Sequence, residues 1–368
     1  MKPACVAIVI NFPSYHQVDL FNALAEAGTL EFKIFYLRQI TTGRQWKRLR
    51  QIRHPHVFCP WVTVCGVYYF NPTFHSLLAA YKPEILIVTQ YANLTMQLAM
   101  YERAIKKNPW VFWAEAPGVR FSEHYHFRSD RLRRWLRNMA LLPLRFHPMR
   151  VWGVGRLASE QYSTLSASPA INIPYYFDTS VFAKAHLGRK SRRRKHILFA
   201  GNLIYRKGID LVLSAADHLV RKRQDFSLHI VGDGPLRYLV ENLPSHLKRV
   251  VTYEGFAEID QMPRYYQVSD ILLFPSRYDG WGMGIVEGMA AGLAVVATTS
   301  CGAAMDAIVH GENGLIISPG TVEPIVSALE SMLDDPSVIQ RLGNAALRTA
   351  ARYDARIGAS ALVEGLFN

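Results

Sequence analysis

The sequence SRYDGWGMGIVEGMAAGLAVVAT, residues 276–298, places two carboxylates around a run of alternating glycines. Asp279 and Glu287 are separated by seven residues, of which three are glycines. Glycine lets backbone amides approach a ligand because no side chain stands in the way, and carboxylates accept hydrogen bonds from hydroxyl groups. The stretch therefore predicts a ligand-binding loop that enters a helix. The alternative is structural: the small residues only permit close packing of that helix.

Strand and helix patterns alternate on both sides of this loop. Strands are predicted at 5–11, 32–37, 84–90, 110–115, 196–202, 226–234, 251–256, 270–276 and 294–299, and helices at 17–28, 72–83, 93–107 and 208–222. Such repeated units are typical of parallel sheets covered by helices. The expected fold class is α/β, with two doubly wound Rossmann-like domains that face a cleft. Ligands are expected at the carboxyl ends of the strands.

A chain of 368 residues is too long for one ordinary core, which predicts two domains. Residues 172–196 are rich in turn formers and then in charge, so the boundary is expected near 180–195. We assign residues 1–185 to the first domain and 186–352 to the second. A last helix, about 353–368, is expected to pack back on the first domain.

The composition is strongly basic: 42 Lys and Arg against 29 Asp and Glu give a formal net charge of +13. An excess of this kind indicates nucleic acid, anionic lipid or a phosphorylated substrate as partner. Arginines concentrate at 44–53, 128–137 and 189–195, and no nucleic-acid-binding module is recognisable, so nucleic acid is not the expected partner.

Cysteine usage and hydropathy bear on the compartment. The four cysteines form no CxxC pair and have no histidines at metal spacing, which favours reduced thiols in a cytoplasm and no metal site. The apolar N-terminal run has strand length and is read as a first strand instead of a signal peptide. Residues 288–305 carry no charge but are mostly Gly, Ala and Thr, so a buried helix and strand are expected there instead of a membrane span.

Two further turns come directly after predicted strands. FAGNLIYRKGID (199–210) is a strand, a turn with Arg206 and Lys207, and a helix. Such a turn directs free N–H groups and a helix dipole at one point, which suits a phosphate; the alternative is a solvated basic turn. VGDGPLR (231–237) imitates a dinucleotide fingerprint, but Pro235 and Leu236 replace its last part, so a tight turn explains it better than a NAD site.

Taken in order, GNLIYRKG, GDGPLR, the glycine-rich stretch 276–298 and GENGLII (311–317) resemble the retaining nucleotide-sugar glycosyltransferases of family 4, which have the GT-B fold. The resemblance covers residues 196 to about 335. It implies an acceptor-binding first domain, a donor-binding second domain, and transfer of a sugar from a nucleoside-diphosphate sugar with retention of configuration. No Asp-x-Asp motif is present, so a metal-independent enzyme without a cofactor is expected.

The resemblance assigns roles at the phosphate end of the donor. Lys207 matches the lysine that holds the diphosphate. The family arginine falls on Asn202, which removes one charge, and Arg206 is the candidate to replace it. Asp279 stands where the family has a glutamate near the sugar hydroxyls, with a side chain one methylene shorter.

The resemblance also assigns residues that would bind the nucleoside of the donor. Glu287 matches the acid that accepts hydrogen bonds from the ribose, and Phe256 lies where the family cradles the base. Backbone amides of three further residues are implied to approach the sugar and phosphate: Trp281, Gly282 and Met283.

In the first domain, the strand VFWAE ends in Glu115, where the family often has a histidine. A carboxylate after an apolar run is costly unless it is used or paired, so Glu115 is a candidate catalytic residue. His16, His124 and His126 are weaker candidates, since each fits a surface or packing role equally well.

Residues 127–143 combine apolar and basic faces. Leu132, Trp135, Leu136, Met139 and Leu142 recur at helical spacing among five arginines. A helix of this kind can lie on anionic lipid. We therefore expect a cytoplasmic protein, peripheral on the inner face of the membrane, with a saccharide or lipid-linked saccharide as acceptor in polysaccharide or glycan assembly. The alternative is a core-facing helix with a solvated basic face.

Two other functions fit the same motifs. Asn202 and Asp279 depart from the family and favour a non-catalytic subunit that binds nucleotide sugars. A nucleotide-sugar epimerase of the GT-B fold is the other alternative, although those enzymes carry different arrangements of acids.

Overall fold

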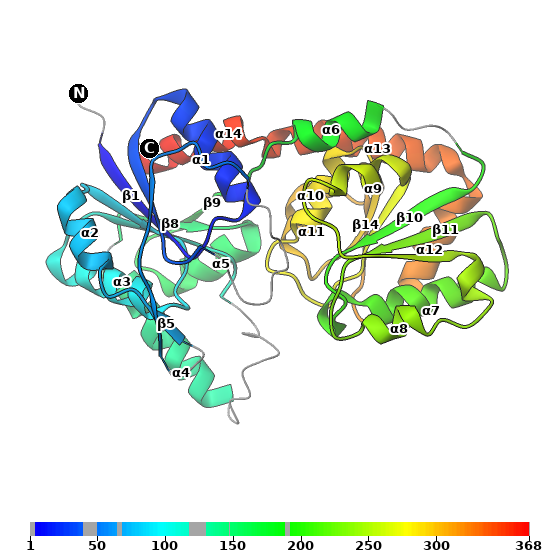
Figure 1. The fold of residues 1–368 in the computed structure, drawn as a ribbon, viewed down its shortest axis with the longest axis horizontal. Coiled ribbons are helices and arrows are strands. Elements are labelled where there is room, and N and C mark those ends of the chain that lie inside the picture. The colour runs from blue at the N-terminus through cyan, green and yellow to red at the C-terminus, as the bar shows by residue number, and fades with distance from the viewer. Residues whose placement is uncertain are drawn as a thin grey trace. The chain divides into compact units, whose positions relative to one another are not determined.

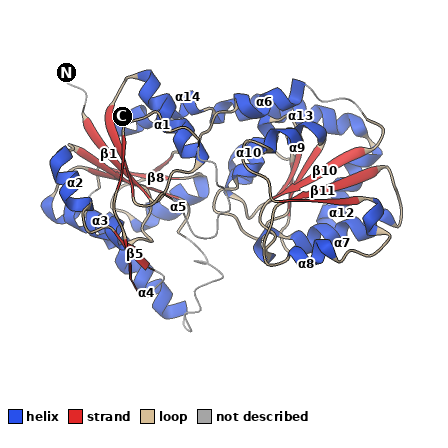
Figure 2. Ribbon diagram, viewed as in Figure 1, coloured by secondary structure: helices blue, strands red, loops and turns tan. Residues whose placement is uncertain are grey.

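The computed structural model describes residues 4–39, 50–64, 68–117, 130–146, 148–187 and 192–367. The chain divides into two compact units. Of the described residues, unit 1 holds those up to Phe177 and those from Ala355 onward, and unit 2 holds Asp178–Asp354. In each unit, strands form a sheet with helices on its faces, as Figures 1 and 2 show.

Unit 1 is built on a seven-stranded parallel sheet with the order β3-β2-β1-β6-β7-β8-β9. Its strands are β1 (Cys5–Ile10), β2 (Glu31–Tyr36), β3 (His56–Phe58), β6 (Ile85–Val88), β7 (Trp110–Ala114), β8 (Arg150–Gly153) and β9 (Ala170–Asn172), and β4 (Val62–Val64) and β5 (Tyr68–Phe70) form a separate antiparallel pair. Its helices are α1 (Tyr15–Ala27), α2 (Phe74–Tyr81), α3 (Leu94–Lys106), α4 (Asp130–Leu141), η1 (Leu142–Arg145), α5 (Arg156–Leu165) and α14 (Ala355–Phe367).

Unit 2 repeats this arrangement with six parallel strands in the order β12-β11-β10-β13-β14-β15. The strands are β10 (Lys195–Ala200), β11 (Phe226–Val231), β12 (Val251–Gly255), β13 (Ile271–Phe274), β14 (Ala294–Thr298) and β15 (Leu315–Ile317). The helices are α6 (Ser180–Leu187), η2 (Tyr205–Lys207), α7 (Ile209–Val220), α8 (Arg237–Glu241), η3 (Leu247–Arg249), α9 (Met262–Val268), α10 (Met283–Ala290), α11 (Gly302–Ala307), α12 (Glu323–Asp334), α13 (Pro336–Ala350) and η4 (Ala351–Tyr353).

The strand order reverses once in each sheet, between β1 and β6 in unit 1 and between β10 and β13 in unit 2. In open α/β sheets, ligands bind beyond the carboxyl ends of the strands at such a reversal. The turn after β10 and the loop after β13 are therefore adjacent in unit 2. These are the two segments that the sequence marks as candidate sites.

Residues 288–305 are a buried part of unit 2. Strand β14 is buried along its whole length, and the second half of α10 is buried with it. This confirms the expected helix and strand. Over the described part of the chain, no helix has both the length and the apolar character needed to cross a membrane.

Helix α14 returns to unit 1 and packs on α1. The backbone N–H of Ala355 donates to the carbonyl of Phe177 at 2.9 Å. Gly358 lies against the ring of Tyr176, so close that a Cβ atom there would stand 2.4 Å from it. The last helix thus completes a unit that begins with the first strand.

The structure differs from the sequence-based expectation in two places. Residues 178–185, which were assigned to the first domain, belong to unit 2, because Ser180–Leu187 form helix α6 and pack there. The short strands β3, β8 and β9 were not predicted, because three or four residues are too few to show a pattern. Cys5, Cys59 and Cys301 form no disulfide, and Cys65 lies outside the described residues.

Candidate functional site

Two glycine turns lie against each other at the carboxyl ends of β10 and β11. Gly201 donates its N–H to the carbonyl of Val231 at 3.0 Å. A Cβ atom on Gly232 would stand 1.9 Å from the carbonyl oxygen of Gly201, and one on Gly234 2.6 Å from that of Leu203. Only glycine permits this approach, so residues 232–234 (GDG) pack directly against the backbone of the turn after β10.

The turn after β10 leads through η2 into α7. Gly208 adopts φ 76° and caps the helix. A Cβ atom on Gly208 would stand 2.5 Å from the carbonyl oxygen of Pro275, the residue directly after β13. The start of α7 is therefore pressed against the loop that carries Asp279.

Lys207, Arg206 and Asp279 form one charged cluster. The Nζ of Lys207 donates to the Asp279 carboxylate and lies 4.7 Å from the centre of the Phe274 ring. Arg206 Nη1 lies 3.6 Å from Asp279 Oδ1 and donates to the carbonyl of Tyr278 at 2.8 Å. Burial alone would raise the pKa of Asp279, but the charges of Lys207 and Arg206 outweigh it and lower that pKa.

The glycine-rich loop is fixed by its backbone. Asp279 donates its N–H to the carbonyl of Ser300 at 3.0 Å, and Ala303 donates to the carbonyl of Trp281 at 2.8 Å. The Trp281 side chain is buried, with its ring 6.0 Å from that of Tyr353. Gly282, at φ 93°, starts α10. The side chain of Trp281 is thus part of the core, and the expected approach of its backbone amide to a ligand stays a prediction.

Glu287 lies on the second turn of α10 and is 6% exposed. Its Oε2 accepts a hydrogen bond from the hydroxyl of Tyr266 at 2.8 Å. Burial and the Glu287 charge raise the pKa of Tyr266 well above its ordinary value, so the phenol stays protonated and donates. That Glu287 binds a ribose stays a prediction.

Asn202 and Phe256 lie at the same edge of the sheet. Asn202 is exposed in the turn after β10. Phe256, 36% exposed, comes after β12 and directly after Gly255, whose carbonyl accepts from Gly232 at 2.8 Å. The structure therefore brings the donor-site candidates of unit 2 to the segments that follow β10, β12 and β13, with Glu287 buried on the helix after β13.

Two candidates of unit 1, Glu115 and His16, lie in the segments that follow strands β7 and β1. Glu115 comes directly after β7 and is half-buried, and its backbone carbonyl accepts from the Tyr162 hydroxyl at 2.7 Å. His16 is buried at the start of α1, 3.2 Å from Ser14 Oγ, with its ring 4.5 Å from that of Tyr175. His124 and His126 lie outside the described residues, as do parts of the three basic segments.

Comparison with known families identifies the part of unit 2 that contains the charged cluster. The family described as "Glycosyl transferases group 1" matches residues 186–349. These residues form a glycosyl transferases group 1 domain. This confirms the resemblance to glycosyltransferases at the level of group 1, and Lys207 and Asp279 both fall inside the match.

The chain is similar to named transferases. Alpha-D-kanosaminyltransferase of Streptomyces kanamyceticus is 29% identical over 69% of this chain and 62% of its own length. A GDP-mannose-dependent alpha-(1-6)-phosphatidylinositol monomannoside mannosyltransferase of Mycobacterium tuberculosis is 30% identical over 45% of this chain and 48% of its own. The matched region thus spans less than two thirds of either relative.

Solved structures confirm the fold. Alr3699/HepE of Anabaena, solved in complex with UDP, covers 99% of both chains with a TM-score of 0.74 and 16% identity. Two Rossmann-like halves, as predicted, are therefore the architecture of the whole chain and not only of the group 1 domain.

One supporting residue of the group 1 domain, Arg277, was missed in the sequence. Its guanidinium binds both oxygens of Asp210 at 2.8 and 2.7 Å and lies 3.7 Å from the centre of the Tyr205 ring. Its backbone N–H donates to the carbonyl of Arg206 at 2.8 Å. Arg277 thus ties the turn that bears Lys207 to the loop that bears Asp279. Only a long-range pairing reveals this, because Asp210 is 67 residues away.

Tyr266 was missed for a similar reason. It stands in the ordinary-looking helix α9, and nothing in RYYQVSD marks it. Its contact with Glu287 exists only because α9 and α10 share one face of the sheet.

Proposed function

We propose that this chain is a retaining, metal-independent glycosyltransferase of family 4 that moves a sugar from a nucleoside-diphosphate sugar to an acceptor. The observation that carries the proposal is the cluster of Lys207, Arg206 and Asp279, held by glycine turns where the strand order of unit 2 reverses. A diphosphate leaving group needs cations and backbone donors that are already in place when charge develops on it.

The ion pair of Lys207 with Asp279 defines the first step. Without donor, the Asp279 carboxylate neutralises Lys207. When a diphosphate arrives, the lysine exchanges this carboxylate for phosphate oxygens, and Asp279 is released toward the sugar hydroxyls. The bond between the anomeric carbon and the phosphate oxygen then breaks, with its electron pair on the diphosphate, which Lys207 stabilises while an oxocarbenium-like centre forms.

The other candidates take the remaining parts of the donor. Phe256, exposed at the strand ends, lies against the base, and Glu287 reaches the ribose after it changes its partner from Tyr266 to the hydroxyls. Arg206 supplies the charge that Asn202 lacks, and its bond to the Tyr278 carbonyl holds it beside the phosphate position.

Glu115 is proposed to act on the acceptor side, near the anomeric carbon. It stands at the carboxyl end of a buried strand, where polar groups of α/β enzymes reach their substrates. Glu115→Gln keeps the size of the side chain and removes its charge. We expect it to reduce turnover and leave donor affinity intact; unchanged turnover in the folded variant would exclude this role.

We further propose that unit 1 binds an anionic membrane and takes a lipid-linked saccharide as acceptor, in glycan assembly on the inner face. Leu132, Trp135, Leu136 and Met139 are all 42–57% exposed on α4, beside the exposed Arg131 and Arg134. The core-facing alternative does not fit these four side chains, since such a helix would bury them.

The apolar surface extends beyond α4. The Tyr101 hydroxyl on α3 donates to the Met139 carbonyl at 2.6 Å, and Leu94 and Leu98 are exposed on the same helix α3. Asn93 ties the start of α3 to the Tyr69 carbonyl of strand β5. Exposed apolar side chains on two helices that contact each other, with arginines among them, are suited to lipid, and one relative is named for a phosphatidylinositol-based acceptor.

The proposal is tested by release of nucleoside diphosphate. The full chain is screened by thermal shift against UDP, GDP and ADP sugars, and the best donor is then supplied with membrane extracts as acceptor. Acceptor-dependent release together with a glycosylated lipid supports the transferase. Donor binding without release in any extract would instead indicate the non-catalytic subunit, and conversion of the donor to its epimer the epimerase.

A further inference from the structure

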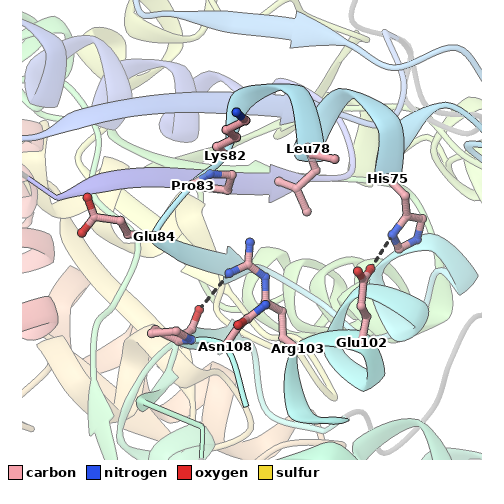
Figure 3. Close-up of a pocket in the computed structure, with 10 residues that line it drawn as sticks. His75, Leu78, Lys82, Pro83, Glu84, Glu102, Arg103 and Asn108 are labelled. Carbon is pink, nitrogen blue, oxygen red and sulfur yellow. Dashed lines mark hydrogen bonds and ion pairs between the residues drawn. The ribbon is translucent and has the colours of Figure 1, made fainter. Parts of the chain in front are cut away.

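A cavity of about 330 Å³ opens in unit 1 at the edge of the sheet where β6 and β7 begin (Figure 3). The ends of α2 and α3 form two of its walls. Asn108 precedes β7, whereas Glu115 comes after it, so the cavity and the proposed catalytic carboxylate lie at opposite edges of the sheet. The proposed reaction therefore makes no use of this cavity.

Arg103, on the last turn of α3, is the most unusual residue of the lining. It is 9% exposed, and its guanidinium points into the cavity (Figure 3). A guanidinium carries five N–H donors, and a buried charge is costly unless it is paired. Within the described part of the chain, the only side-chain hydrogen bond of Arg103 goes to the carbonyl of Pro109, at 3.4 Å. Among the described residues, the protein therefore gives the Arg103 guanidinium one long hydrogen bond and the nearby charge of Glu102, and its other N–H donors are left for a ligand in the cavity.

Neither carboxylate of the lining supplies an acceptor for these donors. Glu102 accepts from His75 Nδ1 at 2.7 Å and from Lys106 Nζ at 2.6 Å. Glu84 is exposed at the rim, and in Figure 3 its carboxylate lies well away from the guanidinium. Among the described residues, neither carboxylate forms an ion pair with Arg103. A second cation, the exposed Lys82, caps α2 and also lines the cavity.

We propose that this cavity binds a small monocarboxylate. Its two oxygens would accept from the planar fork of Arg103, with Lys82 as the second cation. Its short hydrocarbon part would lie on the apolar lining formed by Leu78, Ala79, Pro83 and Pro109.

The surroundings favour one negative charge over two. Helices α2 and α3 both end at the cavity, and a helix carries partial negative charge at its C-terminus. Glu84 and Glu102 add to this field. A phosphate dianion is therefore disfavoured, whereas a singly charged, planar carboxylate matches the guanidinium without excess charge.

The test is calorimetric titration of the full chain with sodium propionate, with sodium phosphate and sodium chloride as comparison ligands. We expect saturable one-to-one binding of propionate only. Arg103→Gln should weaken it by about tenfold or more, the effect of losing a charged hydrogen-bonded partner. Lys82→Gln should weaken it less. Lys107→Gln is the matched control, because Lys107 is an exposed neighbour outside the lining and should change nothing.

Two variants of the lining, Arg103→Gln and Lys82→Gln, are used so that the test does not depend on the folding of either one. Thermal unfolding first establishes that Arg103→Gln is folded; if it is not, the exposed Lys82 decides alone, with Lys107→Gln beside it. The proposal is overturned if propionate gives no saturable binding to the unaltered chain. Equal affinity in the unaltered chain and the folded variants overturns it too, and so does tighter binding of phosphate than of propionate.

Discussion

The two units share one architecture and differ in the turns at the carboxyl ends of their strands. Both are parallel sheets with a single reversal of strand order. In unit 2, the reversal carries the ion-paired Lys207 and Asp279. In unit 1, the turn after β1 carries Ser14, His16 and Gln17, which hydrogen-bond through the Ser14 hydroxyl. The sheet therefore serves as a frame, and the segments after its strands give each edge its own chemistry, an ion pair in unit 2 and hydrogen-bonded polar side chains in unit 1.

The largest effect is expected at the charged edge of unit 2. Lys207→Ala removes the cation that would stabilise the leaving group, so kcat should fall by about 10²–10³, as for loss of one preorganised donor. Turnover assays with the donor identified by thermal shift measure this. Lys222→Ala, which breaks the exposed pair with Glu330, is the control and should keep full activity. A folded Lys207→Ala enzyme with normal kcat would show that the charged edge of unit 2 does not stabilise the leaving group, and this difference in function between the two units would be lost.

Glu287 tests how deep the donor site of unit 2 reaches. If its carboxylate turns from Tyr266 to the ribose, Glu287→Ala should weaken donor binding by about 1.5–3 kcal/mol, the range for a hydrogen bond to a charged group. Calorimetric titration with nucleoside diphosphate measures the loss. Tyr266→Phe removes the internal partner without touching the carboxylate and should leave binding at least as strong. If Glu287→Ala and the unaltered chain bind nucleoside diphosphate with equal affinity, Glu287 is not part of the donor site, which is then limited to the segments after β10 and β13.

Unit 1 contains a buried histidine that should make it the acid-sensitive unit. His54 Nδ1 lies 2.9 Å from Asn22 Oδ1, and its Nε2 lies 2.9 Å from the Tyr36 hydroxyl. Burial, and then the charge of His56, lower the pKa of His54 from 6.5 to about 4. The unfolded chain therefore binds the extra proton first, and stability is lost as the pH falls below 6.5.

Between pH 7 and pH 5 this loss amounts to about 2 kcal/mol. Thermal unfolding at the two pH values measures it, with signals assigned to unit 1 by hydrogen exchange. His54→Gln should flatten the pH dependence, whereas His246→Gln, at an exposed histidine of unit 2, should preserve it. A pH dependence that persists in His54→Gln would assign acid sensitivity to other groups.

The smallest effect concerns the apolar surface of unit 1. Trp135→Ser with Leu136→Ser should reduce sedimentation with anionic liposomes by about tenfold, because apolar area no longer enters the lipid. Binding should also fall with salt. Leu187→Ser, at an 85% exposed leucine of unit 2, is the control and should bind like the unaltered chain. Chain that stays in the supernatant at every lipid composition contradicts the proposal.

The sequence allowed the fold to be predicted because buried parallel strands are continuous apolar runs. Strands β1, β7 and β14 begin and end within two residues of their predicted bounds. The pairing of Lys207 with the Asp279 loop was accessible through motif order alone. Arg277, Tyr266 and Arg103 were not, since each acquires its role from a partner on another element or from a cavity, and neither is visible in local patterns.

Helix α14 has a consequence for how the chain is made. Unit 2 is continuous from Asp178 to Asp354, so all its residues are synthesised before Ala355. Unit 1 begins first but receives the helix that packs on α1 only after unit 2 has emerged from the ribosome. Until α14 has emerged, the surface of α1 that it covers stays open, and transiently exposed apolar surface of this kind favours aggregation during folding.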